Sequence, residues 1–203
     1  MSVERMSRVD TAWLRMDSDA NLMMIVGVWL IAPQLTVAEV RERVQSRLLA
    51  YRRFKQKVVQ DAAGASWVDD DRFDITHHVQ REELEPHVGE APLQALQRRV
   101  ADLAALPLDP SRPLWQWHVV ENFDGEHSAL ISRIHHCIGD GIALISVMLS
   151  VADGGKPPPA RASKAPPDDE FEGMDWLAQA VLKPFNMAAT QAGDMAVKSI
   201  GVA

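Results

Sequence analysis

The sequence predicts an α/β protein in which helices flank a mixed β-sheet, and three observations lead to this fold class. Residues 22–31 form a continuous apolar run of strand length. Residues 36–51 and 92–106 repeat their apolar side chains at helical spacing. Residues 114–135 contain two apolar segments joined by an Asp-Gly turn, which is a strong hairpin signal. Because hairpins occur among the helices, we expect a sheet that is not purely parallel.

The first two elements are a buried strand and an amphipathic helix. Residues 22–31, LMMIVGVWLI, are bulky and uncharged, which is typical of a strand buried on both faces. Residues 36–51 open with the capping-box pair Thr36 and Glu39, in which each side chain satisfies the backbone N–H of the other residue. The helix that follows has one apolar face, formed by Val37, Val40, Val44 and Leu48.

The next stretch predicts shorter β segments. Residues 54–70 predict a hairpin around Gly64, and residues 73–79, FDITHHV, predict a short strand. This strand contains the adjacent pair His77 and His78, which has no glycine beside it and no obvious acidic partner. We therefore expect a half-exposed histidine pair without a function in chemistry.

The central part of the chain predicts a helix, a hairpin and a further helix. Residues 92–106 form an amphipathic helix, which Pro107 ends. Residues 114–123 and 127–135 are the two strands of the hairpin. Residues 141–153 begin with a run of apolar side chains long enough for a helix.

Composition divides the chain into three parts. Residues 1–153 are predicted to form one α/β domain. Residues 154–171 carry five prolines and many charges, which predicts a linker because such a segment cannot build a core. Residues 172–203 contain two helical stretches broken at Pro184. Since these helices have little to pack against, we expect a partner half that this sequence lacks.

Composition and charge exclude several classes of protein. The net charge of −7 argues against a nucleic-acid binder, which needs a concentrated basic face. Cys137 is the single cysteine, so no internal disulfide can form, which fits a reducing cytosol. No apolar run reaches the roughly 18 residues of a membrane span. The first residues, MSVERMSRVD, lack the apolar core of a signal peptide, so we expect a cytoplasmic protein.

The segment 133–145, RIHHCIGDGIALI, places two histidines at the joint between two apolar segments. In a strand, side chains alternate between the two faces. One face would carry Leu130, Ser132, Ile134 and His136, and the other Ala129, Ile131, Arg133 and His135. The two imidazoles would then point apart, which disfavours a shared metal ion because its ligands must converge.

A nucleophilic mechanism is also disfavoured at this joint. Ser132 and Cys137 are the nearest nucleophiles, and neither lies in a G-x-S-x-G turn. A lone cysteine at a strand end is more often a small buried apolar side chain. A general base fits better, because one imidazole with a pKa near ambient pH can take the proton of an attacking hydroxyl.

His136 is the candidate for this base, since it would lie at the end of a strand. Asp140 would lie at the start of the next helix, where a carboxylate is favoured as an N-cap. We expect its effect on chemistry to be indirect, through the loop that holds His136. Gly139 and Gly141 would let the backbone turn sharply beside it.

Three motifs in order resemble one acyltransferase family. HHCIGDG matches the H-H-x-x-x-D-G signature of the chloramphenicol acetyltransferase-like acyltransferases, which include condensation domains of peptide synthetases and plant alcohol acyltransferases. Residues 6–31 and 107–121 are similar to the amino-terminal segment and the Pro-Leu-Trp region of the bacterial wax ester synthase/diacylglycerol acyltransferases. The resemblance covers residues 6–150. It implies the N-terminal half of a two-domain α/β sandwich whose active site lies in a tunnel between the domains, with residues 172–203 as the start of the crossover to the C-terminal domain.

The resemblance also implies roles for the site residues. His136 would be the general base, and His135 a secondary residue that orients the loop. Asp140 would be structural, with an arginine partner for which Arg15 and Arg133 are equal candidates. The motif residues that would shape the domain near the site are Pro113, Leu114 and Trp115, although a turn followed by a core tryptophan explains them equally well on local grounds.

The implied reaction is O-acyl transfer from acyl-CoA, as co-substrate, to a fatty alcohol or diacylglycerol, without a metal or other cofactor. The implied partners are the C-terminal half of the same enzyme and the surface of a membrane or lipid inclusion. Residues 175–198 are a candidate for that peripheral contact. Two alternatives stay open: a condensation domain that uses carrier-protein thioesters, and a non-catalytic fragment that binds acyl ligands.

Overall fold

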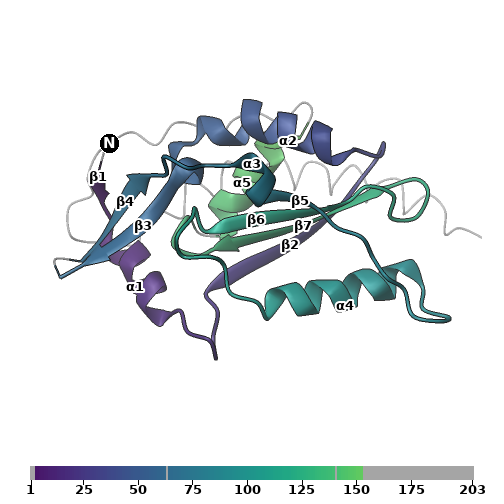
Figure 1. Ribbon diagram of the computed structural model, residues 1–203, viewed down its shortest axis with the longest axis horizontal. Helices are drawn as coiled ribbons and strands as arrows, with labels where there is room; N and C mark the ends of the chain where they lie inside the picture. Colours follow the sequence, from purple (N-terminus) through teal and green to yellow (C-terminus); the bar gives the residue numbers. More distant parts are fainter. Residues whose placement is uncertain (1–2, 63, 140, 153–203) are drawn as a thin grey trace, which may run out of the picture.

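The computed structural model describes residues 3–62, 64–139 and 141–152. The predicted linker at 154–171 and the predicted crossover helices at 172–203 lie outside the described residues. Two sheets form the centre of the molecule (Figure 1). The smaller has the order β1-β4-β3 and the larger the order β2-β7-β6-β5. Their strands are β1 (Val3–Arg5), β2 (Met24–Ile31), β3 (Gln56–Asp61), β4 (Gly64–Asp69), β5 (Val79–Arg81), β6 (Trp115–Val120) and β7 (Ser128–His135).

Five α-helices surround these sheets in the described part of the chain. They are α1 (Arg8–Met16), α2 (Val37–Ser46), α3 (Ile75–His78), α4 (Pro92–Ala104) and α5 (Gly141–Val151). Two short 3₁₀ helices, Leu48–Ala50 and Arg52–Lys55, connect α2 to β3. In the larger sheet β5 and β6 are parallel, whereas β2, β7 and β6 are antiparallel neighbours. The predicted mixed sheet with flanking helices is therefore confirmed.

Most of the predicted elements are confirmed at nearly the predicted positions, but the expectation that the first strand is buried is wrong. That strand, β2, has no buried residue, and Val28 and Leu30 are 45% and 53% exposed, because β2 is an edge strand of the larger sheet in the described part of the chain. The hairpin around Gly64 is the β3–β4 pair, and the hairpin after residue 114 is the β6–β7 pair. The capping box of α2 is present, because Thr36 Oγ1 accepts from Glu39 N at 3.2 Å and Glu39 Oε2 accepts from Thr36 N at 2.8 Å. Gly125 has a φ of 94°, which a turn of this hairpin type favours.

The prediction of a strand over residues 73–79 is wrong for most of that segment. Asp74 caps a short helix, α3, by accepting from Thr76 N at 2.9 Å, and only the last residue belongs to β5. The expectation of a half-exposed histidine pair is wrong for His78, which is 1% exposed. Its ring is stacked between Phe73 at 4.9 Å and Trp115 at 4.5 Å. These contacts with residues near and far in the sequence outweigh the local β preference.

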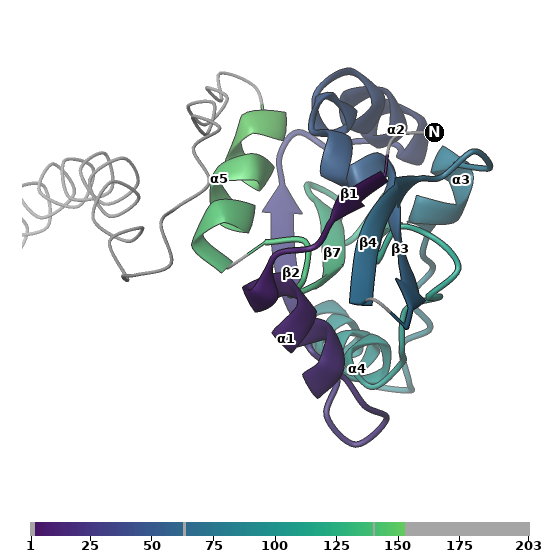
Figure 2. The ribbon, with the colours of Figure 1, turned by 90° about the vertical axis from the view of Figure 1, so that its left-hand side faces the viewer.

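The larger sheet is covered on both faces. Helices α2 and α5 lie over one face and α4 over the other (Figures 1 and 2). Leu130 and Ile134 of β7 pack into the core under α2 and α5, whereas Ala129 and Ile131 pack with Leu96 of α4. The predicted alternation along β7 is therefore confirmed, and all eight of its residues are buried.

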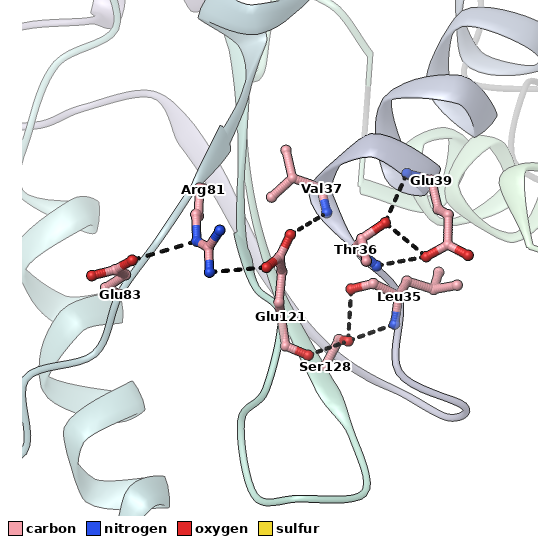
Figure 3. Close-up of polar contacts among 8 residues, drawn as sticks. All are labelled: Leu35, Thr36, Val37, Glu39, Arg81, Glu83, Glu121 and Ser128. Carbon is pink, nitrogen blue, oxygen red and sulfur yellow. Dashed lines mark hydrogen bonds and ion pairs between the residues drawn. The ribbon is translucent and has the colours of Figure 1, made fainter.

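The start of α2 is attached to the sheet by buried and half-buried polar contacts (Figure 3). Glu121 at the end of β6 accepts from Val37 N at 2.8 Å and pairs with Arg81 at 3.1 Å. Ser128 Oγ accepts from Leu35 N at 2.7 Å and lies 2.9 Å from the carbonyl oxygen of Glu121. Because these contacts fix the far end of β7, the histidines at its other end project from a rigid support.

Among the described residues, no helix is both long and apolar enough to cross a membrane.

Candidate active site

The two histidines of the motif lie where β7 ends, between β2 and the segment that precedes β6. His135 is the last residue of β7, and its backbone N–H donates to the carbonyl oxygen of Leu114 at 3.0 Å. The backbone N–H of His136 donates to the carbonyl oxygen of Met23 at 2.8 Å. These two hydrogen bonds extend the pairing of β7 with β6 and with β2 by one residue each. The backbone of the histidine pair is therefore fixed on both sides.

The imidazole of His135 is buried and has a defined tautomer. Its Nδ1 accepts from the backbone N–H of Cys137 at 3.0 Å, so its proton must reside on Nε2. That nitrogen lies 3.7 Å from Asp17 Oδ2, which is too long for a hydrogen bond but close enough for electrostatic attraction. Burial lowers the pKa of His135, and the carboxylate of Asp17 opposes this effect only in part. His135 is thus a neutral ring that links the loop to the residue after α1.

Asp17 is itself held in place. It follows α1 as its C-cap residue, and its Oδ1 accepts from the backbone N–H of Met23 at 2.7 Å. Met23 also provides the carbonyl oxygen that binds His136 N. Asp17 therefore contacts one histidine and the backbone partner of the other.

The imidazole of His136 is held by an aromatic contact. It is stacked on Trp13 of α1, with ring centroids 4.5 Å apart and an interplanar angle of 21°. His136 Nδ1 is buried and has no hydrogen-bond partner among the described residues. Stacking fixes the plane of a ring without occupying its nitrogens. Trp13 therefore fixes the plane of the His136 ring, and Nδ1 is left without a partner in the described part of the chain.

Helix α1 holds both histidines, a role that the motif alone did not reveal. Trp13 and Asp17 are four residues apart, which places them on the same side of a helix or its direct continuation. Trp13 contacts His136 and Asp17 faces His135. Within residues 6–31, an aromatic and an acidic residue at helical spacing indicate a shared helix face. No local feature of the sequence indicates which part of the fold that face contacts.

The structure disfavours both nearby nucleophiles. Cys137 is 1% exposed, and burial raises the pKa of its thiol to about 12, so the reactive thiolate does not form near neutral pH. The prediction that Cys137 is a small buried side chain is confirmed. Ser132 is buried within β7, and its Oγ lies 3.3 Å from the carbonyl oxygen of Gly27.

The loop after the histidines is described only in part. Asp140 lies outside the described residues, so its roles at the helix start and with an arginine stay predictions. Helix α5 begins at Gly141, directly after it. Neither Gly139 nor Gly141 is among the described glycines with positive φ. A Cβ on Gly139 would meet Leu144 at 3.6 Å, an ordinary contact, so the backbone itself does not require these glycines.

The two candidate arginines lie in different surroundings. Arg133 is 3% exposed and donates to Gln116 Oε1 at 2.8 Å and to the carbonyl oxygen of Leu106. Burial lowers the pKa of its guanidinium. Arg15 is exposed on α1 and lines a surface cavity. No contact with Asp140 is described for either of them.

The Pro-Leu-Trp residues divide between the site and the core. Leu114 contacts the site through its carbonyl oxygen, which binds His135 N. Trp115 is fully buried, donates from Nε1 to the carbonyl oxygen of Phe54 at 2.9 Å, and stacks on His78. Pro113 is buried directly before them. A place for Trp115 in a substrate pocket stays a prediction.

The described residues contain no group of three or more His, Cys, Asp or Glu side chains placed to hold a metal ion.

Comparison with solved structures defines the class of fold. The chain superposes on a wax ester synthase/diacylglycerol acyltransferase from Marinobacter aquaeolei VT8 with a TM-score of 0.57 and 23% identity, covering 70% of this chain and 35% of that one. It superposes on the starter condensation domain of rhizomide synthetase RzmA with a TM-score of 0.60 and 15% identity, covering 75% of this chain and 37% of that one. The fold is that of the chloramphenicol acetyltransferase-like α/β sandwiches.

Comparison of sequences then defines the family. The model of the wax ester synthase/diacylglycerol acyltransferase catalytic domain matches residues 6–197, so the chain belongs to this family. The tgs3 protein of Mycobacterium tuberculosis, named a probable diacylglycerol O-acyltransferase, is 34% identical over 165 residues. The match covers 78% of this chain and 59% of that relative. The tgs1 protein of the same species, named likewise, is 29% identical over 74% of this chain and 33% of its own length.

Proposed function

We propose that the complete protein transfers a long-chain acyl group from acyl-CoA to the hydroxyl of a fatty alcohol or diacylglycerol, with His136 as the general base. The observation that carries this proposal is the state of the His136 ring, which is held by Trp13 and has an unoccupied, buried Nδ1. Family membership supplies the class of reaction. The names of the relatives support an acylglycerol product.

The reaction needs one proton acceptor and no covalent intermediate on the protein. As the alcohol oxygen attacks the thioester carbonyl carbon, its proton passes to an imidazole nitrogen of His136. The tetrahedral intermediate then collapses, and the carbon–sulfur bond breaks. The departing CoA thiolate takes the proton from the imidazolium, which leaves an ester, a CoA thiol and the neutral base. A ring held in a fixed orientation suits the first of these steps.

His135 is a positioning residue in this proposal. Its neutral ring accepts from Cys137 N and faces Asp17, so neither nitrogen is directed at a substrate. Its loss would loosen the loop that carries His136 rather than remove the proton acceptor. We therefore expect His135→Ala to reduce turnover less than His136→Ala does.

The donor and the partners belong to the same proposal. A starter condensation domain of this fold was solved in complex with C8-CoA, so an acyl-CoA is a ligand that the fold accommodates. The chain spans 59% of the length of its relative tgs3 and about a third of that of tgs1. We propose that the remaining part, the C-terminal half, completes the substrate tunnel, and that the protein reaches its apolar substrates by peripheral contact with a lipid surface.

The alternative from the same fold is a condensation domain that forms an amide from carrier-protein thioesters. Several condensation domains superpose as well as the wax ester synthase does, with TM-scores up to 0.62. Their identity of 14–15% reflects a shared fold, whereas the family match extends over residues 6–197. The acyltransferase is therefore better supported, and a non-catalytic fragment is the outcome if no transfer is found.

The test is an assay of the complete protein with acyl-CoA donors from acetyl to palmitoyl and with hexadecanol or dioleoylglycerol as acceptor. We expect activity to rise with acyl length, since each buried methylene contributes about 0.8 kcal/mol. His136→Ala should lower turnover on the order of 100-fold or more. Near-normal turnover in folded His136→Ala protein would eliminate the base assignment, and a preference for acetyl-CoA over palmitoyl-CoA would eliminate the long-chain substrate.

A further inference from the structure

A surface cavity of about 610 Å³ lies between α1 and the edge of the smaller sheet. Its lining includes Arg5 from β1, Arg8 and Arg15 from α1, and Gly64 and Ala65 from β4. Three arginines therefore line one hollow in a protein whose net charge is −7. This cavity is separate from the histidine pair, because Trp13 contacts His136 from a different face of α1.

Two arginines of the cavity, Arg8 and Arg15, differ from several other arginines of the surface. Arg52 pairs with Asp69 at 2.6 Å and Arg98 pairs with Glu90 at 3.0 Å. Arg8 and Arg15, by contrast, have no ion pair within the part of the chain that the structure describes. Arg8 is also the first residue of α1, where the helix dipole disfavours a cation. Two unpaired like charges in one hollow repel each other, and an anion bound between them would relieve this repulsion.

The rest of the lining suits a ligand that is larger than a bare ion. Met6, which is buried, and Met16, which is exposed, add apolar surface beside the arginines. The volume is within the range of about 300–1,000 Å³ that is usual for small-molecule sites. Gly64 at the rim of the hollow has a φ of 129°, a backbone conformation that favours glycine. Guanidinium groups beside flexible thioether side chains suit a phosphate group that is attached to an organic molecule.

We propose that this cavity binds the phosphate group of a phosphate ester, with Arg8 and Arg15 as the principal ligands and Arg5 beside them. Guanidinium groups bind phosphate oxygens in bidentate fashion, which gives both affinity and orientation. Two sources share this chemistry: the phosphates of coenzyme A and the headgroup of an anionic phospholipid. The site does not require His136 to be a base, so it can be tested independently of catalysis.

The experiment compares binding by the complete wild-type protein and an Arg8→Gln/Arg15→Gln variant. The soluble probe is coenzyme A, with phosphate-free pantetheine as its control. The lipid probe is phosphatidylcholine vesicles that contain phosphatidic acid, with pure phosphatidylcholine vesicles as their control. Arg52→Gln is the matched protein control, because it removes an exposed arginine that already has a carboxylate partner. Thermal melts of each variant establish that the proteins are folded.

The expected result is that the double variant binds one or both phosphate probes at least about tenfold more weakly, whereas Arg52→Gln binds like wild type. If the double variant loses affinity for coenzyme A alone, the ligand is the soluble phosphate ester. If it loses affinity for phosphatidic acid alone, the ligand is the lipid headgroup. Wild-type binding should also weaken as salt is raised, because these arginines are exposed. Equal binding by wild type and double variant, or no preference of wild type for either phosphate probe over its control, would overturn the proposal.

Discussion

The stack between Trp13 and His136 makes a quantitative prediction about turnover. Replacing Trp13 with alanine removes the ring that lies 4.5 Å from the imidazole and leaves the backbone bond between His136 and Met23 in place. A stacked aromatic pair contributes about 0.5–1.5 kcal/mol. If all of this energy holds the reactive orientation, Trp13→Ala should lower kcat by about 2- to 12-fold, because about 1.36 kcal/mol corresponds to a tenfold change in rate.

The assay follows release of the CoA thiol at saturating acyl-CoA and alcohol, and the buried Cys137 should not react with the thiol reagent. KM should change little, since Trp13 contacts the base. Trp13→Phe, which keeps an aromatic face, should recover most of the rate. Trp29→Ala is the matched control, because Trp29 is also half-buried and makes no ring contact with either histidine of the site. Full kcat in folded Trp13→Ala protein, or equal loss in Trp13→Phe, would refute the positioning role.

Two further predictions concern stability. Burial lowers the pKa of His78 to about 4 from an unfolded value of 6.5. Between these two pH values the unfolded chain binds a proton at this ring, whereas the native ring stays neutral. The free energy of unfolding should therefore fall by up to about 3 kcal/mol between pH 6.5 and 4. His78→Gln, which can still donate to the carbonyl oxygen of Trp115, should show a shallower pH dependence in urea titrations, and an unchanged slope would contradict this. Thr36→Ala should lower the free energy of unfolding by about 1 kcal/mol through loss of the α2 cap, whereas Thr36→Ser should not; equal stability of the two variants would count against the cap.

The elements that the sequence predicted well are those whose signals are local. The capping pair Thr36 and Glu39 and the turn at Gly125 act within a few residues, and each determines its own structure. Helix α3 was missed for the opposite reason. Its isoleucine and threonine favour a strand by propensity, but the ring of His78 packs between Phe73 and Trp115. Trp115 comes close to this segment only when the sheet has formed.

The same distinction applies to the site. The histidine pair could be located because its spacing to Asp140 is a local motif. The contacts that define the two rings are not local, since Trp13 and Asp17 lie more than a hundred residues earlier in the chain. Their spacing predicts a common helical face, but only the packing of α1 against the end of β7 shows which residues that face meets.

The site joins the most buried strand of the larger sheet to a helix with no buried residue. All eight residues of β7 are buried, whereas none of the nine in α1 is, although Trp13 and Leu14 pack against a small cluster beneath it. Segments with few buried contacts open locally at lower free energy than the core does. We therefore expect heating to abolish activity, through the opening of α1, at a lower temperature than the one at which the sheet melts. Substitutions that anchor α1 could extend the working temperature without changing the core.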